Sequence, residues 1–281
     1  MLQPVIECEH YGKLAEQRDR IVSLYGRSSN FDKFDEEQWR DCLAIITDIR
    51  NQIKAVVQSS PVIQAFLHHD FFSSFHSVFM ITDGLISRFW SNKTEIIEEL
   101  RILLRHSIRV LESLEFYVED SSLSLKPIPL QALFDDIVGF ARAKYFRKYP
   151  EGISVEIKND LVINGHEGIL WVLLYNMVKN ALKHGCASLI TIKAYKQGDA
   201  VVIEMIDDGL GVKAEIVDRI FDYGKGKGAT GSGLGLANAR ERLATMGGTI
   251  KLDPHGGMQQ ANRETSGAKF TLSFGRYLQD H

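Results

Sequence analysis

The sequence predicts an α+β protein. An N-terminal helical hairpin forms a dimeric four-helix bundle, and an α/β sandwich domain with a mixed sheet follows it. Two observations carry this prediction. Between residues 60 and 118, apolar side chains recur at alternating spacings of three and four, which is a heptad pattern. Beyond residue 130, segments with helical periodicity alternate with short segments rich in Val and Ile, which are typical of strands.

The first helix of the hairpin is predicted to start at Ser60 and Pro61, because serine is a favoured N-cap and proline suits the first helical position. Its apolar seam consists of Phe71, Phe75, Val78, Thr82, Leu85 and Phe89. The stripe on the opposite face consists of His69, Ser73, His76, Met80 and Asp83. We expect this outer stripe to point away from the bundle, where a reactive side chain can meet another domain.

A short turn at residues 91–94 leads to the second helix of the hairpin. Its seam consists of Ile97, Leu100, Leu104, Ser107, Leu111, Leu114 and Val118. Two helices of this kind form a hairpin, and two hairpins close a four-helix bundle. The sequence therefore predicts a homodimer in which each chain contributes one hairpin.

Residues 35–57 are also expected to be helical, with apolar residues on one face and a polar turn before them. Their role is left open. The segment could transmit a signal from an upstream sensor partner, add a dimer contact or dock another protein. It could also be what remains of a longer sensor.

The connector at residues 121–130 contains Pro127 and Pro129 and is rich in serine, a composition that suits a hinge. Beyond it, helices are predicted at residues 131–148, 169–184 and 234–246. Strands are predicted at residues 152–158, 188–194, 200–206, 248–252 and 268–274. Several strands follow one another directly, so we expect a mixed sheet with helices on one face.

Two asparagines on the helix at residues 169–184 indicate a cation site. Asn176 and Asn180 are four residues apart, so they share one face of an otherwise apolar helix. Amide oxygens suit magnesium, a hard cation that proteins usually bind together with phosphates. Lys183 follows three residues later and can reach the same phosphates.

A carboxylate stands at the end of the strand at residues 200–206. Asp207 can accept a hydrogen bond there from the amino group of adenine. Gly209 and Gly211 permit a turn and a close approach of the base. An Asp-Gly turn is common by itself, so this pattern gains its meaning from the neighbouring motifs.

A glycine-rich turn opens the helix at residues 234–246. Gly231 and Gly233 lead into Leu234 and Gly235. Glycines let the backbone approach phosphates, and a helix N-terminus favours anions. Residues 226–231 also match a dinucleotide-binding fingerprint, but no strand precedes them, and the sequence has no P-loop ending in Lys-Ser or Lys-Thr.

In this order and spacing, the motifs resemble the ATPase domain shared by gyrase, heat-shock chaperones, MutL and sensor histidine kinases. Asn176 and Asn180 match its asparagine box, residues 207–211 match its first glycine box, and residues 231–236 match its second. Phe221 resembles the phenylalanine between the glycine boxes. The resemblance covers residues 127–275.

The resemblance implies ATP and Mg²⁺ as cofactors. Asn180 would coordinate the magnesium, while Asn176 and Lys183 would support the metal and the phosphates. Asp207 would contact adenine. Residues 224–230 would form a mobile lid over ATP.

Upstream, residues 69–75 resemble the phosphoacceptor box of histidine kinases. His69 supplies an imidazole that is a nucleophile near physiological pH, and the Asp70 carboxylate can fix its tautomer and remove its ring proton. The match is partial, because Phe72 replaces a basic residue and Ser74 replaces proline. Ser73 stands where the Thr or Asn of the family assists dephosphorylation.

Composition and charge exclude several classes of protein. The 281-residue chain has a net charge of -3, which gives no broad electrostatic case for binding nucleic acid or an anionic membrane. No apolar run has the length of a membrane span and no signal peptide is recognised, so we expect a cytoplasmic protein. Cys8, Cys42 and Cys186 are scattered, and no disulfide framework or zinc site follows from their spacing.

The predicted domains are an N-terminal helical segment (1–58), a dimerisation and histidine-phosphotransfer hairpin (59–120), a hinge (121–130) and a catalytic ATP-binding domain (131–281). The resemblance implies a two-component histidine kinase that phosphorylates His69 from Mg-ATP. The phosphoryl group would pass to an aspartate on the receiver domain of a response regulator.

Two alternatives are open. The chain could be a non-catalytic phosphotransfer or scaffold dimer, against which the intact ATPase boxes argue. It could also be a serine kinase of the anti-sigma-factor type, against which the heptad hairpin with His69 and Asp70 argues.

Overall fold

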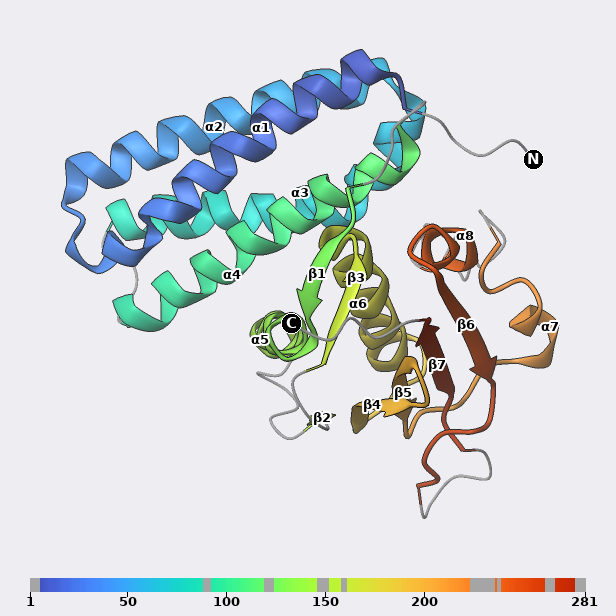
Figure 1. Cartoon of the computed structure of the whole chain (residues 1–281). Coiled ribbons are helices and arrows are strands. Elements are labelled where there is room, and N and C mark those ends of the chain that lie inside the picture. Colours follow the sequence, from blue (N-terminus) through green and yellow to red (C-terminus); the bar gives the residue numbers. More distant parts are fainter. Residues whose placement is uncertain are drawn as a thin grey trace. The chain divides into compact units, whose positions relative to one another are not determined.

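Figure 1 shows the computed structural model of the chain. It describes residues 6–87, 92–118, 124–145, 152–157, 161–222, 236, 239–260 and 266–275, without the side chains of residues 61, 62, 65, 66, 68–70, 73 and 143–145. The chain divides into two compact units, Met1–Ser122 and Leu123–His281. The helical segment at residues 1–58 and the hairpin at residues 59–120 thus lie in one unit, and the separate roles expected for them stay predictions.

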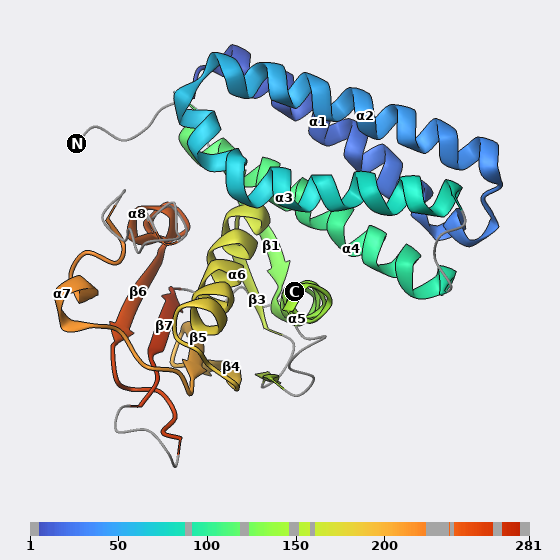
Figure 2. The ribbon, with the colours of Figure 1, turned by 180° about the vertical axis from the view of Figure 1, so that it is seen from behind.

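Within the described residues, the first unit contains four long helices. They are α1 (Cys8–Gly26), α2 (Glu36–Ser59), α3 (Pro61–Ile86) and α4 (Lys93–Glu112). Short 3₁₀ helices follow α1 at Arg27–Lys33 and α4 at Ser113–Tyr117. Helix α1 packs against α2 and α4, and α3 packs against the same two helices, so the four enclose one core (Figure 1 and Figure 2).

Most residues of both predicted seams lie in this core, whereas Leu85 and Val118 are half-buried and Phe89 lies outside the described residues. The enclosed residues of the α3 seam are Phe71, Phe75, Val78 and Thr82. The buried set on α4 includes Ile97, Leu100, Leu104, Ser107 and Leu111. The apolar residues that face them come from the same chain: Leu14, Ile21 and Leu24 on α1, and Trp39, Cys42, Ile46, Ile49 and Ile53 on α2.

The expected bundle of two hairpins from two chains is therefore not confirmed. Helices α1 and α2 supply the apolar stripes that we expected from a second copy of the hairpin. The heptad spacing of α3 and α4 indicates that other helices cover their seams. It does not indicate whether those helices belong to the same chain. Homodimerisation stays a prediction, and the two seams no longer require it.

Side-chain caps fix where these helices begin. Asp35 accepts a hydrogen bond from the Gln38 backbone amide at 2.8 Å, and the Gln38 side chain accepts one from the Asp35 amide at 3.0 Å, which is a capping box. Ser60 caps α3 through the Ile63 amide at 3.4 Å, as the sequence predicts. Asn92 caps α4, so this helix begins at Lys93, inside the predicted turn.

The second unit contains a five-stranded sheet in the order β2-β4-β5-β7-β6. The strands are β2 (Ile153–Ile157), β4 (Ile190–Gln197), β5 (Ala200–Asp207), β6 (Gly248–Asp253) and β7 (Lys269–Phe274). Strands β2 and β4 are parallel and the other neighbours are antiparallel, which confirms the predicted mixed sheet. Along β7, Phe270, Leu272 and Phe274 are buried and alternate with half-buried residues, so one face of the sheet is covered.

Three helices lie along this sheet (Figure 1). They are α5 (Leu130–Tyr145), α6 (Glu167–Lys183) and α8 (Ala239–Ala244); a short helix, α7, spans Ala214–Val217. Helix α5 packs against α6 and β2, while α8 packs against β6. Between α5 and α6, the ring of Phe140 meets the rings of Trp171 and Tyr175 at centroid distances of 5.5 and 4.9 Å. This aromatic contact holds α6 in register on α5.

The sequence missed two short strands. β1 (Lys126–Pro129) pairs antiparallel with β3 (Val162–Gly165), with Ile128 opposite Ile163. Strand β1 takes up the end of the predicted hinge, so Pro127 and Pro129 belong to a sheet. Proline is tolerated there because a strand of a two-stranded sheet has one edge that needs no donor. The helix expected at residues 234–246 also ends earlier, at Ala244.

Among the described residues, no helix combines the length and the apolar composition that a membrane span requires. None of the three cysteines, Cys8, Cys42 and Cys186, forms a disulfide with another. Cys42 lies in the core of the first unit, whereas the other two are exposed.

Replacing Phe75 by alanine should destabilise the first unit by about 3–5 kcal/mol, because a fully buried aromatic side chain would leave a cavity. The matched control on the same helix is Met80→Ala, since the Met80 side chain is 50% exposed, and it should change the stability by no more than about 0.5 kcal/mol. Urea unfolding followed by circular dichroism measures both values. Similar small effects for the two variants would show that the seam of α3 is not a core surface.

Candidate functional site

The face of α6 that carries the two predicted asparagines runs from the core of the second unit to its surface. The side chain of His166 caps the helix by accepting a hydrogen bond from the Ile169 amide at 3.3 Å. Asn176 is buried, with 2% of its surface exposed, whereas Asn180 is half-buried and Lys183 is exposed. The three predicted polar residues therefore follow one another along the C-terminal half of the helix, with rising access to solvent.

Asn176 carries an unusual polar atom. Its Oδ1 is buried and has no hydrogen-bond partner within the described part of the chain. Buried polar atoms are nearly always paired with protein groups, water or a ligand. An amide oxygen of this kind fits a site that a hydrated cation or a ligand completes.

The described residues do not form a cation site by themselves. Among them, no cluster of three or more His, Cys, Asp or Glu side chains could hold a metal ion. The amide oxygens of Asn176 and Asn180 are weak ligands without a carboxylate beside them. They fit magnesium that is held jointly with the phosphates of a bound nucleotide, which is how proteins commonly bind this ion.

Asp207 ends β5 inside the second unit, as predicted. Its Oδ1 accepts hydrogen bonds from the amides of Gly209 at 2.9 Å and Ala268 at 3.1 Å. No donor from the described residues reaches Oδ2, so this oxygen can accept a bond from the amino group of a ligand. Burial raises the pKa of Asp207 above its ordinary value, and the two backbone hydrogen bonds oppose that rise only in part.

The predicted glycines stand where the backbone of Asp207 meets other loops. A Cβ on Gly209 would lie 2.5 Å from the Gly185 carbonyl oxygen, just beyond the end of α6. Gly211 has a φ of +71°, and a Cβ there would lie 2.5 Å from the Pro254 carbonyl oxygen. Gly267, which sequence reasoning missed, is equally constrained, because its Cβ would lie 2.5 Å from Asp207 Oδ1. Side chains at these positions would push the segments around Asp207 apart.

The sequence analysis also missed Asp208, which directly follows the residue predicted to contact adenine. Its carboxylate accepts hydrogen bonds from the Ser188 amide at 2.7 Å, the Ser188 hydroxyl at 2.6 Å and the Leu189 amide at 2.9 Å. The Gln260 amide group donates a further bond at 2.5 Å. Burial raises the pKa of Asp208, but these hydrogen bonds outweigh it, so the net shift is below the ordinary value. Asp208 thus ties the end of β5 to the loop before β4 and to the loop before β7.

Phe221, which was matched to the family phenylalanine, is buried and contacts β7. Its ring lies 6.4 Å from the ring of Phe270 on β7. The guanidinium carbon of Arg240 on α8 lies 4.8 Å from the same ring, within the range of a cation–π contact. Phe221 therefore anchors the segment after α7 to the sheet.

Several predicted site residues lie outside the described residues. These are Gly231, Gly233, Leu234 and Gly235 of the second glycine box, together with the proposed lid at residues 224–230. His69 and Asp70 lie on α3, but their side chains are likewise not described.

The helix around His69 can still be compared with its expected orientation. Leu67 and the seam residue Phe71 are buried, while His76, Met80 and Asp83 of the outer stripe are exposed. His106 on α4 is buried.

With this geometry in view, residues 165–277 match the protein family described as "Histidine kinase-, DNA gyrase B-, and HSP90-like ATPase". The matched range contains α6, Asp207 and the glycine turn that follows it. The second unit therefore carries an ATPase domain of this family.

Two curated proteins that the chain resembles are sensor proteins. The chain is 26% identical over 202 residues to the sensor protein ChvG of Agrobacterium fabrum, an alignment that covers 63% of this chain and 33% of ChvG. It is 33% identical over 109 residues to the aerobic respiration control sensor protein ArcB of Escherichia coli, which covers 36% of this chain and 13% of ArcB. The chain thus spans a third or less of these relatives.

A solved structure, full-length ShkA in complex with AMPPNP, shares the fold with a TM-score of 0.51 at 20% identity. The superposition covers 82% of this chain and 47% of ShkA. Together with the sequence matches, this confirms the resemblance of the chain to a sensor histidine kinase core.

Replacing Asp208 by asparagine should destabilise the second unit by about 1–3 kcal/mol at neutral pH, because an amide cannot accept all of these hydrogen bonds. The pKa of Asp208 is lowered in the folded chain, so its ionised form stabilises the fold above the unfolded pKa, and this stabilisation is lost as the pH falls through the folded pKa. The difference between wild type and variant should therefore narrow below about pH 4.

Chemical unfolding at several pH values measures this difference. Asp199→Asn is the matched control, because Asp199 is exposed in the turn between β4 and β5. A gap between Asp208→Asn and wild type that does not change with pH would contradict a structural role for the ionised carboxylate.

Proposed function

We propose that this chain is an ATP-dependent protein histidine kinase of a two-component system, which phosphorylates itself on His69 and passes the phosphoryl group to a receiver aspartate. The observation that carries the proposal is Asp207, a buried carboxylate with one oxygen anchored to backbone amides and the other available to a ligand, inside the region that matches the ATPase family. The phosphoacceptor-like box at residues 69–75 directs the proposal to a histidine kinase.

In this proposal, Asp207 Oδ2 accepts a hydrogen bond from the exocyclic amino group of adenine. Gly209 and Gly211 let the turn after Asp207 pack closely against the carbonyls of Gly185 and Pro254, which would shape the proposed adenine site. Asn180 would supply an amide oxygen to Mg²⁺, Asn176 would support that site, and the Lys183 ammonium would neutralise charge on the phosphates. Bound magnesium neutralises phosphate charge.

The second glycine box completes the nucleotide site that we propose. Gly231, Gly233, Leu234 and Gly235 would present backbone amides to the phosphates where the next helix begins. Residues 224–230 would close over the nucleotide as a lid.

The phosphoryl transfer uses the imidazole of His69 as the nucleophile. A ring nitrogen attacks the γ-phosphorus, a nitrogen–phosphorus bond forms, and the bond to the bridging oxygen breaks, so ADP leaves with that electron pair. Asp70 accepts the ring proton. In the second half-reaction, a receiver carboxylate attacks the phosphorus and His69 regains its free nitrogen. Positioning and charge neutralisation are the main contributions that the protein makes to such transfers.

The proposed setting is a cytoplasmic homodimer that works with a response regulator and an upstream sensor partner. Helix α3 continues without interruption past Ser74, which stands where the family has proline. The two alternatives, a non-catalytic scaffold and a serine kinase, differ from this proposal in whether the chain labels itself and on which residue.

Replacing His69 by glutamine should abolish acid-labile, base-stable phosphorylation of the chain while leaving ATP binding unchanged, because only the nucleophile is removed. His76→Gln is the matched control, since His76 is exposed on the same helix and should label as wild type does. The measurement is incubation with γ-labelled ATP and magnesium, followed by mapping of the modified residue. Acid-labile label in His69→Gln, or label found on serine, would contradict the assignment of His69 as the phosphorylated residue.

Replacing Asp207 by asparagine should weaken ATP binding about 10-fold or more, because a charge-assisted hydrogen bond to the adenine amino group is lost. GTP, which has a carbonyl at that position of the base, should bind the variant better than it binds the wild type. Burial raises the pKa of Asp207 and binding needs its ionised form, so wild-type affinity for ATP should fall on acidification sooner than an ordinary aspartate would allow.

Calorimetric titration of both nucleotides over a pH series measures this prediction, with Asp199→Asn as the control. Equal loss of ATP and GTP binding would mean that Asp207 only supports the fold.

A further inference from the structure

The loop that joins β6 to β7 folds back on itself as a short hairpin. The Gly257 amide donates a hydrogen bond to the Gly267 carbonyl at 2.9 Å, and the Gly267 amide donates one to the Met258 carbonyl at 3.0 Å. One further antiparallel bridge extends this pairing. The two arms, residues 257–260 and residues 266–268, are called the β6–β7 hairpin below.

Most polar groups of Asp207 are held by the β6–β7 hairpin. The Asp207 amide donates to the Ala268 carbonyl at 3.0 Å, and the Asp207 carbonyl accepts from the Met258 amide at 2.8 Å. The Oδ1 atom accepts from the Ala268 amide at 3.1 Å, in addition to its bond from Gly209. The hairpin therefore fixes both peptide groups that flank the Cα atom of Asp207, and with them the direction in which Oδ2 points.

Two glycines let the hairpin come this close to Asp207. A Cβ atom on Gly257 or on Gly267 would overlap with the Asp207 carbonyl oxygen. A larger residue at either position would therefore push the hairpin away from the end of β5. Closely packed segments transmit small displacements to one another, so a shift of the hairpin moves Asp207 as well.

The hairpin replaces a strand that is missing at this point of the sheet. On one side, Asp207 pairs with Ile190 of β4. On the other side, the pairing of β5 with β7 ends one residue earlier, at Ile206 and Lys269. A short two-stranded hairpin is only marginally stable by itself, so this one needs an anchor on the rest of the domain.

The side chain of Gln260 supplies such an anchor. Gln260 is half-buried, and its amide nitrogen donates to Asp208 Oδ2 at 2.5 Å and to the Ser188 hydroxyl at 2.8 Å. The lowered pKa of Asp208 keeps its carboxylate ionised at neutral pH, so the first of these bonds is charge-assisted and belongs to the stronger kind. Gln260 thus holds the hairpin against the residue that directly follows Asp207.

We propose that the β6–β7 hairpin sets the selectivity of the candidate site for adenine, and that Gln260 is a positioning residue for the Asp207 carboxylate. Gln260 holds the hairpin on Asp208, and the hairpin holds the peptide groups of Asp207, so Oδ2 keeps the direction in which it meets the amino group of the base. The inference rests on the proposed contact between Asp207 and adenine. Hydrogen bonds weaken steeply when they are misaligned, so a small rotation of this carboxylate is enough to lose recognition of the amino group.

The test compares ATP with purine riboside triphosphate, which has the same sugar and phosphates but lacks the amino group on the base. Calorimetric titration of the full chain in the presence of magnesium gives a dissociation constant for each nucleotide. The ratio of the two constants measures recognition of the amino group. Wild type should prefer ATP about 10-fold, because the analogue cannot donate the charge-assisted hydrogen bond to Asp207.

Two variants remove the anchor in different ways. Gln260→Leu keeps a side chain of similar size without the amide, and the preference for ATP should fall to about 2-fold, while the affinity for the analogue changes less than about 2-fold. Gln260→Glu places a second carboxylate against Asp208, and the repulsion should lower the preference at least as far. The matched control is Gln197→Leu, at an exposed position on β4, which should keep the wild-type preference. Melting curves show whether each variant is folded.

Three results would overturn the inference. An unchanged preference for ATP in both Gln260 variants would do so and would leave the proposed function intact. Equal weakening of both nucleotides in these variants would mean that Gln260 only supports the fold. A wild-type chain that binds neither nucleotide, or does not distinguish them, would remove the proposed contact between Asp207 and adenine, and the inference with it.

Discussion

The hydrogen bonds that converge on the Asp208 carboxylate hold the edge of the second unit together. They link the end of β5 to residues on either side of it that have no regular secondary structure: Ser188, Leu189 and Gln260. The neighbouring carboxylate of Asp207 is in a different state, since burial raises its pKa while the pKa of Asp208 is lowered. The two adjacent aspartates therefore have different environments. The protein supplies hydrogen bonds to the Asp208 carboxylate, whereas Oδ2 of Asp207 has no donor among the described residues.

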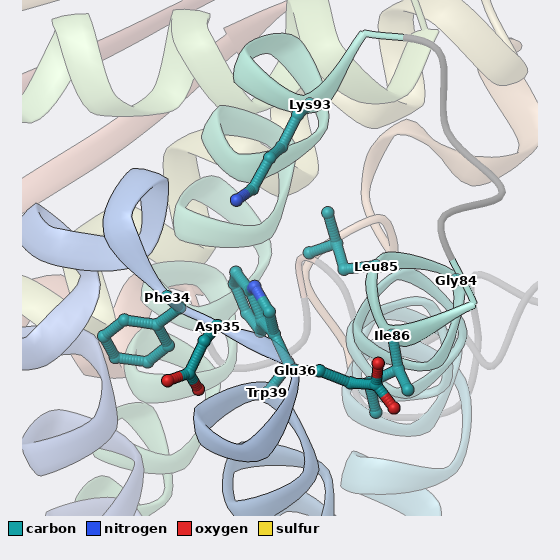
Figure 3. Close-up of a pocket in the computed structure, with 8 residues that line it drawn as sticks. All are labelled: Phe34, Asp35, Glu36, Trp39, Gly84, Leu85, Ile86 and Lys93. Carbon is teal, nitrogen blue, oxygen red and sulfur yellow. The ribbon is translucent and has the colours of Figure 1, made fainter.

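In the first unit, the burial of apolar stripes determines how the four helices pack. Helices α1 and α2 cover the seams of α3 and α4 within one chain, so a single chain completes its own four-helix core. The outer stripe of α3 is exposed at His76, Met80 and Asp83. The packing that closes the core also leaves a cavity between the start of α2 and the end of α3 (Figure 3).

Local patterns made much of this predictable. Heptad spacing located both seams, the Ser-Pro pair located the start of α3, and the run of Val and Ile located β5 with Asp207 at its end. Asp208 had no comparable signal, because its partners Ser188 and Gln260 lie 20 and 52 residues away. Gly267 was missed for the same reason, since only the approach of the Asp207 backbone explains why it must be glycine.

The sequence by itself determined the kinds of element, the chemistry of the asparagine, aspartate and glycine motifs, and the family that they resemble. Each of these depends on residues within a few turns or one strand of each other, where spacing is information. Only the tertiary structure decided which helices cover the heptad seams, which of two adjacent carboxylates the protein satisfies, and that the prolines of the connector join a sheet. These outcomes depend on contacts between segments that are distant in the sequence. The spacing of residues within one segment does not specify which distant segment packs against it.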